Sequence, residues 1–225
     1  MGTNDVANVN RTTPNPANNR ADYVLAKLVL SPSAAHQIKL SAEALNRQNN
    51  TDILSFFGDS GTVATLTDVD ATENIKRDMF RLEHRYAPTD TWFDILNTSF
   101  YAQQTNNQQL GYEARSTAPV VRTRDTSYSE STLGGSVQLE RNFGDGIAHR
   151  LVYGADVAQT TISSFKGGYN SSGTAFVPNK SFPDTDYLVF GAFVQDQIGI
   201  GPVKVTPGLR FDSFRYTPNP DALYR

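Results

Sequence analysis

The sequence predicts an all-β fold, an antiparallel transmembrane β-barrel segment of about eight strands with short periplasmic turns and long external loops. Apolar and polar residues alternate with a period of two, and a helical period does not recur. The expected connections alternate between short and long, as they do in outer-membrane barrels. No apolar run approaches the roughly 18 residues that a membrane-spanning helix needs.

Four expected strands show this alternation directly. Their apolar sides are Ile38, Leu40, Ala42 and Ala44 in 36–47; Phe80, Leu82 and Tyr86 in 74–86; Leu133, Gly135, Val137 and Leu139 in 127–142; and Val203, Val205, Leu209 and Phe211 in 203–216. The opposite, polar rows would line the lumen of a barrel, and they include Lys39, Glu43, Arg77, Arg81, Glu83, Arg85, Lys204 and Arg210.

The other four expected strands lie at 22–30, 92–104, 147–163 and 187–198, and the last contains the longest uncharged apolar stretch, Tyr187–Val194. Aromatic residues gather near strand ends, as an interfacial girdle requires. Tyr86, Trp92, Phe93 and Phe143 lie by short turns, and we expect Phe100, Tyr101, Tyr128, Phe214 and Tyr216 towards the long-loop side.

The connections between these strands argue for a membrane barrel. Short turns are expected at 31–35, 87–91, 143–146 and 199–202, and long loops at 48–73, 105–126 and 164–186. A soluble antiparallel sheet with one wet face would give similar strands. Three long loops favour the barrel, because loops of that length are uncommon in compact soluble domains.

Composition narrows the class of protein. The net charge of −3 offers no basic field for nucleic acid, and the absence of cysteine excludes disulfide frameworks and thiolate metal sites. Residues 1–21 are polar and show no signal-peptide pattern, so we expect a polar lead-in or external loop there. Residues 22–225 would then form the barrel segment.

Two motifs near the C-terminus resemble a known family. Gly191-Ala192-Phe193-Val194-Gln195-Asp196-Gln197, followed by Thr206-Pro207-Gly208-Leu209-Arg210-Phe211-Asp212, resembles the barrel of TonB-dependent outer-membrane receptors. Tyr153-Gly154-Ala155-Asp156 and Phe182-Pro183-Asp184-Thr185 are similar to the haem/haemoglobin branch of that family, which is related to the transferrin and lactoferrin receptors.

The resemblance implies a partial receptor barrel of the outer membrane, a fragment without the plug domain. Its partners would be outer-membrane lipid and haem or a haem-carrying protein, and the TonB system would be reached only through the missing plug region. No cofactor would be bound by the fragment itself, and haem would be the transported ligand. The alternative is a small stand-alone outer-membrane β-barrel with an adhesion or structural role.

Ligand contact in such receptors belongs to long loops on a rigid frame. The candidate residues are Phe56, Phe57, Tyr112, Arg115, Arg122, Arg124 and Tyr169. The aromatic side chains could cover a porphyrin face, and the arginines could pair with propionates. We expect the three histidines, His36, His84 and His149, near the periplasmic rim, far from an external haem.

No catalytic or metal site is predicted, and the chain is not expected to be an enzyme. Gly58-Asp59-Ser60-Gly61 matches a serine-protease tetrapeptide, but His36 lies only 24 residues before Ser60 and no oxyanion framework accompanies them. The acidic groups 68–73 and 184–186 lack the spacing and the glycine of a defined calcium loop.

Overall fold

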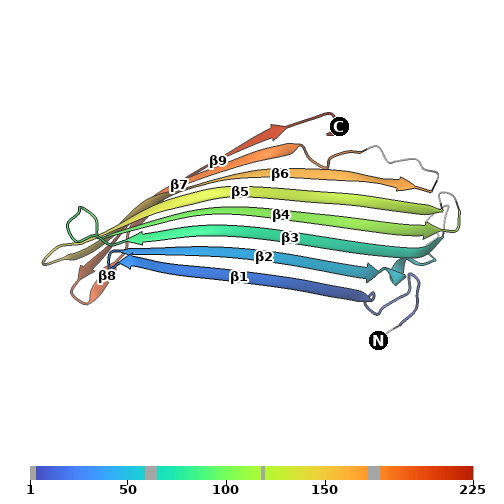
Figure 1. Ribbon diagram of the computed structural model, residues 1–225, viewed down its shortest axis with the longest axis horizontal. Helices are drawn as coiled ribbons and strands as arrows, with labels where there is room; N and C mark the ends of the chain where they lie inside the picture. Colours follow the sequence, from blue (N-terminus) through green and yellow to red (C-terminus); the bar gives the residue numbers. More distant parts are fainter. Residues whose placement is uncertain (1–3, 59–64, 118–119, 172–177, 225) are drawn as a thin grey trace.

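The computed structural model describes residues 4–58, 65–117, 120–171 and 178–224, which form a single antiparallel sheet (Figure 1). The strands are β1 (Ala17–Ser33), β2 (His36–Asp52), β3 (Leu66–Tyr86), β4 (Ile95–Arg115), β5 (Val121–Phe143), β6 (Ala148–Asn170), β7 (Asp184–Ile200), β8 (Val203–Val205) and β9 (Gly208–Asn219). One 3₁₀ turn, η1 (Leu54–Phe56), follows β2.

The sheet is a meander in which each strand pairs with its neighbour in the chain, and β8 and β9 both pair with β7. β1 pairs with β2 and β9 pairs with β7, so the first and last strands form opposite edges and the sheet is open (Figure 1). The predicted all-β antiparallel fold is confirmed. Among the described residues, no helix is long and apolar enough to cross a membrane.

The strands extend further into the expected long loops than predicted. β4 runs to Arg115 and β5 begins at Val121, so most of the expected loop 105–126 is strand, and the loops 48–73 and 164–186 shrink similarly. The missed segments are rich in Asn, Gln, Ser and Thr on both faces, so they carry no period of two in hydrophobicity. Strands that stand in water need no apolar face, and backbone pairing continues through them.

Two other boundaries were wrong. β1 begins at Ala17, so the lead-in ends at residue 16 instead of 21. The expected strand 203–216 is divided into β8 and β9, which gives nine strands instead of eight. Pro207 lies at the break because it has no N–H to donate to the ladder, although its carbonyl still accepts from the Asp196 N–H at 3.0 Å.

The two faces of the sheet differ in chemistry. The pairing places Leu40, Phe80, Phe100, Leu133, Val157, Phe190 and Phe211 on one face of the sheet, here called the outward face, in neighbouring rows across β2 to β9. The inward face carries the predicted polar rows, and many of these charges are paired there: Lys39 with Glu83, Arg77 with Glu43, and Arg210 with Asp156 and Asp212.

The outward face has no protein against it. Phe80, Phe100 and Phe211 are 45%, 44% and 62% exposed, and Val69 is the one buried hydrophobic residue of the described chain. Large apolar side chains gathered on one face, opposite a face of paired ions, are typical of a membrane barrel wall. We therefore place the outward face against lipid and the inward face towards the lumen.

Candidate functional site: an arginine cluster at the long-loop end

The three arginines predicted from the sequence converge around Glu113 at the long-loop end of the inward face. The Arg115 guanidinium lies 2.9 Å from one carboxylate oxygen of Glu113, and that of Arg124 lies 3.2 Å from the other. Arg122 lies directly opposite Glu113 in the β4–β5 register. The sequence named these arginines as separate candidates for ligand contact in loops, and the structure places all three on strands, at one end of the inward face.

Strand parity builds this cluster. Arg122 and Arg124 are two residues apart on β5, and Glu113 and Arg115 are two apart on β4, so each pair shares the inward face. The Glu113 side chain is only 15% exposed, while that of Arg124 is 58% exposed. Two guanidinium groups that share one carboxylate leave a local positive charge that can bind an anion.

Because side chains alternate between the two faces of a strand, two predicted aromatic residues lie on the opposite face from the cluster. Tyr112 and Tyr169 lie on β4 and β6, not in loops, and both side chains are on the outward face. Sequence reasoning missed this division because it placed both residues in irregular loops, where no parity applies. The strands continue there, so neighbours such as Tyr112 and Glu113 point to opposite sides of the wall.

Phe56 and Phe57 lie in the connection between β2 and β3, as predicted. Phe56 ends η1 and is 52% exposed, and Phe57 follows it. The Gly58 N–H donates to the Leu66 carbonyl at 3.1 Å, and Leu66 lies opposite Arg115 in the β3–β4 register. This connection and the arginine cluster therefore meet at the same end of the sheet.

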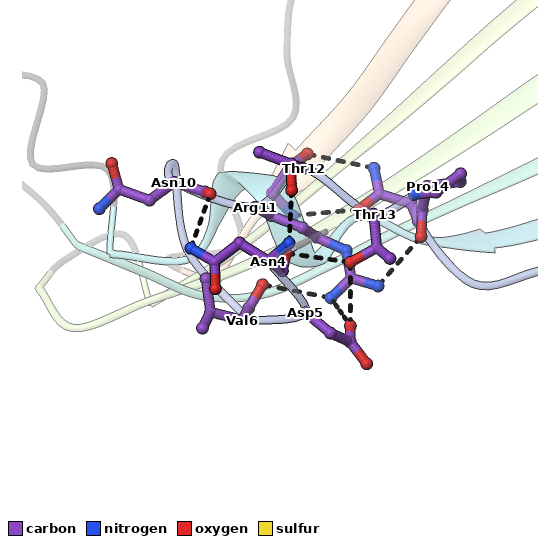
Figure 2. A network of polar contacts seen from close by, with 10 residues as sticks. Asn4, Asp5, Val6, Asn10, Arg11, Thr12, Thr13 and Pro14 are labelled. Carbon is purple, nitrogen blue, oxygen red and sulfur yellow. Dashed lines mark hydrogen bonds and ion pairs between the residues drawn. The ribbon is translucent and has the colours of Figure 1, made fainter. Parts of the chain in front are cut away.

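The N-terminal lead-in is folded onto itself around Arg11 (Figure 2). The Arg11 guanidinium donates to the carbonyls of Val6 and Pro14 at 3.2 and 3.0 Å and pairs with Asp5 at 2.6 Å, and its side chain is 6% exposed. Beyond this clasp, Asn15 exchanges two hydrogen bonds of 3.1 Å with Ser55 in η1. These bonds attach the lead-in to η1, which contains Phe56.

All three histidines lie at the short-turn end, as predicted. His36 Nδ1 lies 2.9 Å from His84 Nε2, and His149 Nδ1 lies 2.7 Å from an Asp196 carboxylate oxygen. Phe93 makes edge-on ring contacts with Tyr86 and Trp92 in the same zone, so the aromatic residues predicted for the short-turn side lie together there. Phe100 and Tyr101 lie nearer this end than the long-loop side, contrary to expectation, because β4 continues well beyond them.

The remaining candidates give no second site. Asp59 to Gly61 of the protease-like tetrapeptide lie outside the described residues, and His36 is engaged with His84 and the Tyr86 ring. In the described ranges, no group of three or more histidine or acidic side chains is arranged to hold a metal ion.

An antiparallel wall with one lipid-facing and one charged face defines the chain as part of an outer-membrane β-barrel. The model of the family described as "TonB dependent receptor-like, beta-barrel" matches residues 4–224, and the chain therefore belongs to that family. Members are receptors of the outer membrane, and they are not enzymes.

A solved structure described as the ferric citrate transporter FecA in the unliganded form has a similar fold, with a TM-score of 0.61 and 15% sequence identity. The match covers 88% of this chain and 30% of that chain, so this chain spans about 30% of its length. No curated protein matches the sequence.

Proposed function

We propose that the chain forms part of the barrel wall of a receptor for TonB-dependent uptake of haem or a haem- or iron-carrying protein. The observation that carries this proposal is the arginine cluster around Glu113 at the long-loop end of the inward face. Guanidinium groups bind carboxylates with two parallel hydrogen bonds. A ligand that presents carboxylates, such as the propionates of haem, would meet that cluster on its way to the lumen.

The similar fold of a ferric citrate transporter supports the broader class, an anionic iron complex. The narrower assignment to haem rests on two motifs, Tyr153–Asp156 and Phe182–Thr185. Phe182 packs its ring edge-on against Tyr128, with ring centroids 6.3 Å apart, and so brings the second motif onto the inward face. Haem would be cargo, and contact with TonB would pass through a plug region that this sheet does not include.

A stand-alone barrel with an adhesion or structural role is the weaker candidate. It would need β1 and β9 to pair with each other, and each pairs with a different strand at an opposite edge. Unpaired backbone groups are not tolerated in lipid. The open sheet is therefore better suited to a larger barrel in which further strands complete both edges.

The test is a haem titration of the refolded chain in detergent, followed by the haem absorption band. Replacing Arg115, Arg122 and Arg124 together with glutamine should weaken haem binding by at least about tenfold, since each lost charged hydrogen bond costs about 1 kcal/mol or more. Arg77→Gln, on the same face outside the cluster, is the matched control. Equal haem affinity in the triple variant and the control would refute the proposal, and tighter binding of ferric citrate than haem would refute the haem assignment alone.

A further inference from the structure

A cavity lies on the outward face at the long-loop end, on the opposite side of the wall from the arginine cluster. Its volume is about 480 Å³, and its lining includes Leu110, Tyr112, Thr123, Asp125, Phe165 and Tyr169 from β4, β5 and β6. The predicted transport route runs along the inward face, so this cavity has no part in it.

The register gives the cavity the form of a slot above β5. Tyr112, Thr123 and Tyr169 form one row across the three strands, and Leu110 and Asp125 lie in the next row. Thr123 and Asp125 make a low floor, and the larger side chains of β4 and β6 make the walls. Because adjacent strands are about 4.8 Å apart, the backbones of the two walls are about 10 Å apart.

The aromatic wall on β6 is shaped by a glycine. A Cβ built on Gly167 would lie 3.0 Å from the Phe165 ring, so that ring lies over the glycine. Tyr169, two residues further on the same face, is 56% exposed, and Phe165 is 36% exposed. The slot thus offers accessible aromatic surface beside its floor.

The charge of the slot is negative. Asp125 accepts from the Gln108 amide at 3.1 Å through each of its oxygens, so its partner there is neutral. Asp70, a second carboxylate of the lining, lies opposite Asp52 in the β2–β3 register. Arg124 also borders the cavity, but its guanidinium pairs with Glu113 on the inward face.

The slot lies well beyond the apolar layer. On the outward face of β4, Ala102 is followed by Gln104, Asn106 and Gln108 before Leu110. Those eight residues span roughly 26 Å along the strand, or roughly 18 Å along the membrane normal at a tilt of about 45°. The slot therefore lies beyond the hydrocarbon layer, where a water-soluble ligand can reach it.

We propose that this slot binds a soluble organic cation, an ammonium head on a small apolar body. Aromatic faces attract such cations through their π-electrons, and a carboxylate floor with a neutral partner supplies the complementary charge. Anionic ligands, such as those suited to the arginine cluster, are repelled. The wall would then carry two sites of opposite charge, one on each face, and the second is independent of the proposed uptake function.

The probe is choline, compared with its uncharged carbon isostere 3,3-dimethylbutan-1-ol. The full chain is refolded in an uncharged polyoxyethylene detergent, and binding is measured by calorimetry and by ligand-observed NMR. Choline should bind saturably and at least about tenfold more tightly than the isostere. Equal binding of the two ligands, or no saturable binding of choline, would overturn the proposal on the unmodified chain.

Variants locate the binding. Asp125→Asn should weaken choline binding about fivefold or more, and Phe165→Ala or Tyr169→Ala about two- to fivefold each, as expected for single cation–π contacts. Asp78→Asn, a carboxylate on the same face outside the slot, is the matched control and should leave choline affinity unchanged. If Asp78→Asn and Asp125→Asn behave alike, choline is attracted only by overall charge, and the proposed slot is wrong.

Discussion

Each long strand has a short-turn half, such as residues 95–103 of β4, and a long-loop half, such as residues 104–115. The two halves differ in how their inward charged side chains are paired. In the short-turn half, Arg150 makes two hydrogen bonds of 2.8 and 2.9 Å to Glu140, and Lys39 pairs with Glu83. In the long-loop half, Glu113 stands among three arginines. The Arg150–Glu140 pair leaves no charge over, whereas the Glu113 carboxylate is shared by two guanidinium groups and leaves a positive charge for a ligand.

The largest expected effect tests where the membrane lies along the strands. Phe100 and Leu110 share β4 and its outward face, and they are 44% and 39% exposed. Phe100→Arg should lower the free energy of unfolding by up to about 2–4 kcal/mol in lipid vesicles, because Phe100 lies within the apolar layer and arginine costs that much at its midplane. Leu110→Arg, beyond the apolar layer, should cost less than about 1 kcal/mol.

Urea titrations in vesicles measure this difference when both variants are made in a complete receptor barrel that contains this wall, so that no strand edge is left unpaired in lipid. The two sites are almost equally exposed in the protein alone, so a soluble sheet would give similar costs for both substitutions. Similar losses would therefore contradict the assignment of the outward face of the short-turn half to lipid.

The next effect tests how closely the strands approach in the short-turn half. A Cβ on Gly154 would lie 2.3 Å from the Val137 carbonyl oxygen, so the backbone itself would have to move. Gly154→Ala should cost about 1–3 kcal/mol by overpacking. Gly146, in a short turn with nothing within 4 Å of a built Cβ, is the control and should tolerate alanine. Equal urea midpoints for the two variants would show that the strands at Gly154 can move apart without a loss of stability.

The motif glycines show what the sequence could reveal of the fold. Gly154 and Gly191 lie in stretches that resemble the receptor family, and a Cβ would meet backbone at Gly154 but only the ends of side chains at Gly191. A Cβ on Gly191 would lie 2.2 Å from the Arg210 guanidinium and 2.9 Å from an Asp156 carboxylate oxygen. The strands of the short-turn half could be predicted because contact with lipid requires an apolar residue at every second position.

The long-loop half was harder to predict, because it lacks that constraint. From residue 104 the outward face of β4 is polar, and Gln104 bonds to Ser129 at 2.9 Å on the next strand instead of facing lipid. A polar stretch of this kind resembles a loop in sequence. The arginines could be named from their chemistry, but their convergence on Glu113, and the separation of Tyr112 from them, required the register.

A smaller effect tests the charge imbalance at the cluster. Glu113→Gln removes the one carboxylate that both Arg115 and Arg124 contact, and it should tighten haem binding by about two- to tenfold through reduced repulsion of the propionates. Glu83→Gln, on the inward face of the short-turn half, is the control. Titration at low and high salt should show the gain shrinking as ions screen it. Weaker haem binding by Glu113→Gln would mean that the carboxylate positions the arginines more than it opposes the ligand.

The smallest effect concerns the ion pairs of Lys180, which join the segment before β7 to the segment after β9 and are called the clamp here. The Lys180 ammonium lies 2.8 Å from Asp184 and 2.6 Å from Asp221, and the Asp221 carboxylate also accepts from the Leu223 N–H at 2.9 Å. The hydrogen bond from Lys180, followed by that from Leu223, lowers the pKa of Asp221 below its usual value. Asp184 and then Asp221 raise the pKa of Lys180.

The lowered pKa of Asp221 and the raised pKa of Lys180 set the pH range in which their ion pair stabilises the fold. A lowered carboxyl pKa contributes stability that is present above its ordinary value of about 3.9 and is lost as the pH falls through the lower folded pKa. A raised ammonium pKa contributes stability that is complete below about 10.4 and is lost at higher pH. The clamp should therefore hold from about pH 4 to pH 10, which a carbon-13 NMR titration of the Asp221 carboxyl group would test at its acid limit. Lys180→Met should move the Asp221 midpoint up towards its ordinary value, and an unchanged midpoint would mean that the lysine does not hold these segments together.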